Sequence, residues 1–239
     1  MKEAASLLNE TNDLILNDLN DYLKSCQISE GRYYHDRVDK SKKKKSYYHV
    51  INTSSMALLF YTNILNLDNR NNFDDYSIKS LITNICKTQR SDGFWPYIEP
   101  NLLQKFFFPY TKLLHNRTKQ ILVRDNSIYF GDAVHHCITL NYLLKSVDKL
   151  GNSDSKVYKQ AIAKGWKFIT NNLIHLDNHQ IKFDFSWEPK PRHLRYCNFI
   201  DSSTYFYIID ILNELYKACL ISEKEKNIYL NQICNYIYE

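Results

Sequence analysis

The chain has 239 residues, of which 44% are hydrophobic and 24% are charged, so its composition is that of a folded globular protein and excludes a largely disordered one. A net charge of +5 permits an anionic ligand but is too small to indicate nucleic-acid binding by itself. No apolar run reaches about 18 residues and no signal peptide is visible, so we expect no transmembrane segment and a cytoplasmic location.

The six cysteines form no C-x-x-C pair, and several fall at core-like positions of expected helices. We therefore expect buried free thiols rather than disulfides or metal ligands. The eight histidines are dispersed and include no H-E-x-x-H pair, and no glycine-rich phosphate loop is present. Neither a metal ion nor another cofactor is expected.

The N-terminal part, residues 1–48, is expected to be one helix and a basic loop that pack on the rest of the chain. Apolar residues recur at helical spacing between residues 3 and 25, with polar residues elsewhere. The run Lys42 to Lys45 follows in a polar stretch. It is interpreted as a solvated loop, and a patch for an anion or a membrane surface is the alternative.

From residue 49 to residue 239 a three-part pattern repeats with a period of roughly 70 to 80 residues. A helix that is apolar almost all round comes first, then a helix with one apolar stripe, and then an extended aromatic segment. The first kind of helix is typical of a buried position and the second of a position that faces solvent on one side. This alternation predicts an all-α fold, an α/α toroid of helical hairpins with inner and outer helices. The inner helices are expected to start near residues 49, 131 and 199, and Ser222 and Glu225 form a capping-box signature at the start of the last outer helix.

The extended segment DGFWPY, residues 92–97, follows the first outer helix. Gly93 permits the positive φ that is needed just past a helix end, and Pro96 prevents the helix from continuing. The segment IKFDFSWEP, which contains Trp187, takes the equivalent place in the second repeat. Two such segments on one rim would form a wall at the mouth of a central cavity.

These motifs resemble those of α/α-toroid proteins of carbohydrate metabolism, in which an outer helix ends in Q-x-x-D-G-x-W-x-Y and the next inner helix opens with D-x-x-H. Here QRSDGFWPY supplies the first motif, GDAVHHC supplies Asp132 and His135, and FIDSSTY supplies Asp201. The resemblance covers roughly residues 49–239 and implies epimerase, lyase or hydrolase chemistry on sugars. A complete toroid of six hairpins is longer than this chain, so we expect a partial toroid or one that another chain, in a homo- or hetero-oligomer, completes.

Terpenoid cyclases and the β-subunits of protein prenyltransferases also have Q-x-x-D-G-x-W segments in α/α barrels. The chain lacks the D-x-D-D acid motif of class II cyclases and a recognisable zinc set. A terpenoid- or prenyl-processing enzyme, with a cavity lined by Phe and Tyr, is therefore kept as an alternative.

The candidate catalytic residues stand at the starts of two expected inner helices. Asp132 and His135 are three residues apart and so share one helical face, where the carboxylate can orient the imidazole for proton transfer. Asp201 and Tyr205 share a face in the same way. The alternative for each pair is structural, with the Asp as an N-cap and the His or Tyr as a packing residue. His136 points about 100° away from His135 on the helix, so one role shared by both is not expected.

The candidate substrate-binding residues combine cations and aromatic rings. Arg192, His193 and Arg195 form the best candidate for an anion site, because Arg suits bidentate recognition of a carboxylate or phosphate. A solvated loop is the alternative there. Aromatic rings can stack on sugar faces, or can pack against an outer helix. The remaining candidates for contact with substrate are Trp95, Tyr97, His136, Trp187 and Glu188.

The sequence therefore predicts a carbohydrate-active protein that acts on an anionic sugar or glycan by proton transfer, as in epimerisation or β-elimination. Its partner would be a small molecule or a glycan and not a nucleic acid. A second alternative is a non-catalytic protein, whose concave face binds a partner or completes a partner's active site. The layering itself predicts a set of buried inner-helix residues: Met56, Leu59, Phe60, Ile138, Leu140, Leu144, Ile208, Ile209 and Leu212.

Overall fold

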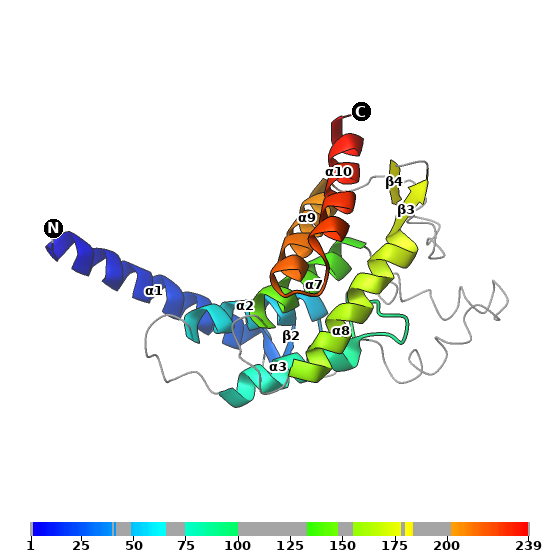
Figure 1. Ribbon diagram of the computed structural model, residues 1–239. Coiled ribbons are helices and arrows are strands. Elements are labelled where there is room, and N and C mark those ends of the chain that lie inside the picture. The colour runs from blue at the N-terminus through cyan, green and yellow to red at the C-terminus, as the bar shows by residue number, and fades with distance from the viewer. Residues whose placement is uncertain are drawn as a thin grey trace.

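The described part of the chain is mainly helical, as the sequence predicts (Figure 1). The computed structural model describes residues 2–39, 41, 49–65, 75–99, 133–147, 155–177, 180–183 and 202–238. Its helices are α1 (Lys2–Cys26), α2 (Ile51–Leu65), α3 (Asp75–Thr88), α7 (Ala133–Val147), α8 (Ser155–Phe168), α9 (Ser202–Lys217) and α10 (Glu223–Tyr238). Each of them lies where the apolar periodicity placed a helix.

Two short antiparallel hairpins accompany the helices. The first pairs β1 (Gln27–Ser29) with β2 (Arg32–Tyr33), and the sequence did not predict it. The second pairs β3 (Ile174–Asp177) with β4 (Gln180–Phe183), and β4 lies in the expected extended segment.

The helical spacing of apolar residues continues from residue 155 to residue 174 and predicts a helix of that length, but α8 is shorter. The last regular turn of α8 ends at Phe168, and a π-helical turn, η3 (Ile169–Leu173), leads into β3. The backbone N–H of Ile174 donates to the carbonyl of Ile169, which closes that wider turn. Two β-branched residues and two asparagines follow Phe168, and these residue types have low helix propensity.

The helices form an inner row with outer helices packed on it (Figure 1). The helix α7 lies between α2 and α9, while α3 packs on α2, α8 on α7 and α10 on α9. The inner helices α7 and α9 run in the same direction. Tyr142 contacts Tyr207, and three residues further along each helix Lys145 binds Asp210, so the contacts advance together along α7 and α9.

Burial of the inner helices agrees with this arrangement in part. Leu140, Leu144, Ile208 and Leu212 are buried as predicted. Four others of the predicted set, Leu59, Phe60, Ile138 and Ile209, are half-buried. The prediction for Met56 is wrong, since its side chain is 44% exposed and is not enclosed by the described elements.

Two local features were predicted correctly. The backbone N–H of Glu225 donates to Ser222 Oγ at 3.1 Å, so Ser222 caps α10. Gly93 has φ of 97°, in the region that favours glycine. Among the described helices, none combines the length and the apolar character that crossing a membrane requires.

The cysteine prediction holds in part. The described cysteines are free thiols: Cys26, Cys86, Cys137, Cys219 and Cys234. Cys26 and Cys137 are buried and Cys86 is half-buried, but Cys219 and Cys234 are exposed, so burial was wrongly expected for these two. Cys219 follows α9 and Cys234 lies in the outer helix α10, so both are in the last hairpin, which keeps a solvent-facing side. Cys197 lies outside the described residues.

Candidate functional site

The segment that follows α3 is fixed in place by side-chain hydrogen bonds. Gln89 Nε2 donates to the carbonyls of Gly93 and Ala161, at 2.9 and 2.8 Å, and so ties the segment to α8. The guanidinium of Arg90 binds both carboxylate oxygens of Asp92, at 3.2 and 2.6 Å. A Cβ at Gly93 would collide with the carbonyl of Lys164, so the glycine serves close approach to α8 as well as positive φ.

Trp95 is at the centre of this packing. Its side chain is 0% exposed, and its Nε1 donates to the carbonyl of Ile85 at 2.9 Å. Gly165 of α8 lies directly against the ring, where a Cβ would collide with it. The prediction that Trp95 binds substrate is therefore wrong, because no ligand can reach a ring that is enclosed by α3 and α8.

His136 is buried beside Trp95 and is also a structural residue. Its Nδ1 accepts the backbone N–H of Trp95 at 3.0 Å, and its Nε2–H donates to the carbonyl of Gly165 at 3.1 Å. Both nitrogens are thus used, which fixes the neutral tautomer. Burial lowers the pKa of His136 to about 4. Phe94 stacks on its ring at 5.2 Å between centroids. The prediction that His136 contacts substrate is also wrong, because no ligand can reach its buried ring.

His135, the next residue, lies in a different environment. It is half-buried in the first turn of α7, and its ring meets that of Tyr97 at 4.3 Å between centroids, with 54° between the planes. The two neighbouring histidines therefore lie in different environments, as their angular separation on the helix leads one to expect. Among the described candidates, the structure brings together one predicted catalytic residue, His135, and one predicted substrate contact, Tyr97.

Backbone pairing places these two residues at the end of the inner row where α2 and α7 begin. The N–H of Ile51 donates to the carbonyl of Tyr97 at 3.0 Å, and the N–H of Glu99 donates to the carbonyl of His49 at 2.9 Å. Val50 and Ile98 form a bridge between these two bonds. We call this end, with residues 49–51, 97–99 and 133–135, the rim.

A hydrogen-bond network that the sequence analysis missed joins the rim to the first hairpin. His49 Nδ1 lies 3.0 Å from Glu99 Oε2, and His49 Nε2 lies 2.8 Å from Ser54 Oγ. The N–H of Tyr33 donates to Ser54 Oγ at 3.2 Å, and Arg32 donates to Glu99 Oε1 at 3.1 Å. These residues are dispersed between positions 32 and 99, and no motif in the sequence links them.

The order serine, histidine, carboxylate is that of a nucleophilic triad, but these side chains are not accessible as the residues of such a triad must be. Ser54 is 0% exposed and already accepts a backbone N–H, so its hydroxyl has no side open to a substrate. The histidine is 6% exposed. The network is therefore structural, and it holds the hairpin β1–β2 and the rim segment against α2.

Tyr205, the fourth predicted catalytic residue, lies in the first turns of α9 and is 7% exposed. Its neighbour Thr204 is fully buried, and the Thr204 hydroxyl has no hydrogen-bond partner among the described residues. The other predicted site residues lie outside the described part of the chain: Asp132, Trp187, Glu188, Arg192, His193, Arg195 and Asp201. The expected approach of Asp132 and Asp201 to His135 therefore stays a prediction. Within the described residues, no group of three or more His, Cys, Asp or Glu side chains could hold a metal ion.

Comparisons with protein-family models, with curated proteins and with solved structures found no match for this chain. Function is therefore inferred from the residues of the rim.

Proposed function

We propose that the rim is the active site of a carbohydrate-active enzyme that acts on an anionic sugar or glycan by proton transfer. The observation that supports this most directly is the contact between His135 and Tyr97. This contact places a half-buried imidazole, which can transfer a proton, beside an aromatic ring, which can stack on a sugar.

The proposed fold behind this site is a partial α/α toroid. The inner row α2, α7 and α9 and the outer helices α3, α8 and α10 support it, because each outer helix packs on the inner helix that precedes it in the chain. In such an arrangement the N-terminal ends of the inner helices meet at one end. Helix N-termini favour anions there, which suits a substrate that carries a carboxylate or phosphate.

In the proposed reaction, His135 removes the proton from the sugar carbon next to the carboxylate. The electron pair of that C–H bond is delocalised into the carboxylate. In epimerisation a proton then returns to the opposite face of the same carbon, and in β-elimination the pair forms a double bond as the substituent on the next carbon leaves. Tyr97 would hold the sugar ring, and the anion would be bound by Arg192 and Arg195, as the sequence predicts.

The test is a substrate screen in D₂O with uronate polymers and sugar nucleotides. Deuterium incorporation next to the carboxylate reports epimerisation, and the absorbance of an unsaturated product reports elimination. Truncation of His135 to Ala should lower turnover by about a hundred- to ten-thousand-fold with the fold intact. The matched control is His35→Ala, because His35 is an exposed histidine that also lies against a tyrosine ring, at 4.0 Å from Tyr34. Equal turnover by wild type and His135→Ala would exclude this residue as the acid or base.

A further inference from the structure

The helix α1 carries an apolar stripe that continues past the part of the molecule on which its C-terminal end packs. Leu23 and Cys26 are buried at that end. On the same side of the helix, Ile15, Leu19 and Tyr22 are 52%, 46% and 37% exposed. Figure 1 shows α1 running away from the other helices toward its N-terminal end. Such a run of exposed apolar side chains is typical of an interaction surface.

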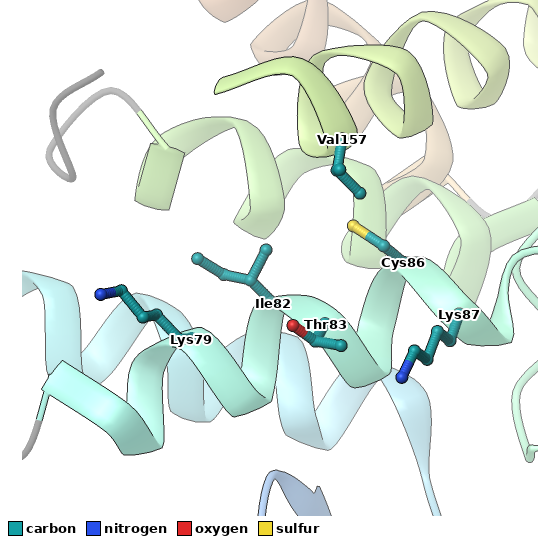
Figure 2. A pocket seen from close by; sticks show the side chains of 6 residues that line it. All are labelled: Lys79, Ile82, Thr83, Cys86, Lys87 and Val157. Carbon is teal, nitrogen blue, oxygen red and sulfur yellow. The ribbon is translucent and has the colours of Figure 1, made fainter. Parts of the chain in front are cut away.

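A groove lies on the outer surface between α3 and α8. It has a volume of about 540 Å³ and is lined by Lys79, Ile82, Thr83, Cys86, Lys87 and Val157. In Figure 2, Lys79 and Lys87 stand toward opposite ends of the groove, with Ile82 and Cys86 pointing from α3 toward Val157 of α8. Val157 is 62% exposed.

The middle of the groove is apolar and its ends are basic. Burial raises the pKa of Cys86 to about 12, so its thiol stays protonated and behaves as a small apolar group. Ile82 and Val157 complete the apolar part. The two lysines are eight residues apart on α3, which corresponds to about 12 Å along the helix. The groove therefore suits an acidic helix with one apolar face.

We propose that α1 of one copy of this chain lies in the groove between α3 and α8 of a second copy. The exposed part of α1 has the required chemistry, because Asp18 and Asp21 lie on one side of its apolar stripe and are exposed. Over its whole length α1 has five acidic residues and two lysines, so its charge is opposite to that of the groove. Two α1 helices paired with each other would instead bring like charges together.

The groove of the same copy is not a suitable partner for α1. Leu23 and Cys26 anchor the C-terminal end of α1 in the core, and the rest of the helix points away from α8 (Figure 1). In a reciprocal exchange, each copy donates one helix and receives one. Both contacts are then satisfied within a closed dimer.

The test is a charge-swap experiment on the full chain, read by light scattering after size exclusion. Wild type is expected to be a dimer. The double variant Lys79→Glu/Lys87→Glu and the double variant Asp18→Lys/Asp21→Lys should each bind themselves at least about tenfold more weakly. A mixture of the two variants should recover the dimer, because the acidic α1 of the first then meets a basic groove and the basic α1 of the second meets an acidic one. Unchanged circular-dichroism spectra show that the four substitutions leave the fold intact.

An apolar substitution with a matched control tests the stripe itself. Leu19→Ser should weaken the dimer, whereas Ile228→Ser on α10 should not, although Ile228 is similarly exposed at 43%. The proposal is overturned if wild type is monomeric, or if the mixture of charge-swapped variants fails to dimerise. It is also overturned if Leu19→Ser disrupts a dimer that the lysine reversals leave unchanged, since α1 would then pair with something other than the groove.

Discussion

The backbone N–H of Trp95 donates to Nδ1 of His136 at 3.0 Å, which joins the aromatic segment after α3 to the inner helix α7. The other ring nitrogen of His136 donates to the carbonyl of Gly165 in α8. One imidazole thus connects three parts of the chain and is enclosed by them. This contact explains why two residues that look suited to a site, a tryptophan and a histidine, are part of the core instead.

Replacing His136 with Ala should destabilise the protein by about 2–4 kcal/mol. The change leaves the N–H of Trp95 and the carbonyl of Gly165 without partners in a buried place and opens a cavity beside Phe94. Urea denaturation followed by circular dichroism measures the difference. His35→Ala, at an exposed position, is the control and should change the free energy of unfolding by less than about 0.5 kcal/mol.

His136 should also make stability depend on pH. Its pKa is about 4 in the folded protein, below the ordinary value of 6.5, so the unfolded chain binds this proton more readily. The stability linked to this group is complete above pH 6.5 and is lost as the pH falls from 6.5 to 4, by about 3 kcal/mol at most. His136→Gln, which does not titrate, should show a shallower fall over this range. Parallel curves for the two proteins would contradict the assignment.

Gly165→Ala should destabilise the protein, although alanine normally stabilises a helix. The added Cβ collides with the Trp95 ring, which is fixed by its own hydrogen bond to Ile85. Overpacking of this kind costs about 1–3 kcal/mol, more than the gain of about 1 kcal/mol in helix propensity. Lys164→Ala, at the exposed neighbouring position, provides the comparison in thermal melts. A higher melting temperature for Gly165→Ala would mean that the ring can move away.

Ser54→Ala should cost about 1–3 kcal/mol of stability and leave any turnover unchanged. It removes the hydroxyl that accepts the N–H of Tyr33 and bonds to Nε2 of His49. Ser55→Ala is a matched control, since Ser55 is equally buried but donates only to the carbonyl of Asn52 within its own helix. Loss of activity in a folded Ser54→Ala protein would show that this serine takes part in the chemistry and does not have a structural role alone.

Leu140→Ala should be far more damaging than Met56→Ala. Leu140 of α7 is fully buried, so its truncation should cost about 2–5 kcal/mol. Met56 of α2 is 44% exposed, and its truncation should cost less than about 1 kcal/mol. Chemical denaturation of both variants measures how far each inner helix is enclosed. Similar losses would show that Met56 is covered in solution.

The sequence alone determined the positions of the described helices, because the spacing of apolar residues along a helix is a local property. The periodicity placed each of the described helices within a few residues of its observed bounds, except at the end of α8. The positive φ of Gly93 and the cap at Ser222 were also predictable, since each depends on one residue type beside a helix end.

The tertiary structure alone decided which of two neighbouring histidines faces the rim and which is enclosed. His135 and His136 differ in environment because Trp95, 41 residues before His136, and Gly165, 29 residues after it, close around one of them. The network from Arg32 to Glu99 and the exposure of Met56 depend in the same way on contacts between distant segments. Residue type and local spacing do not encode such contacts, because burial of a side chain depends on which other helix packs against it.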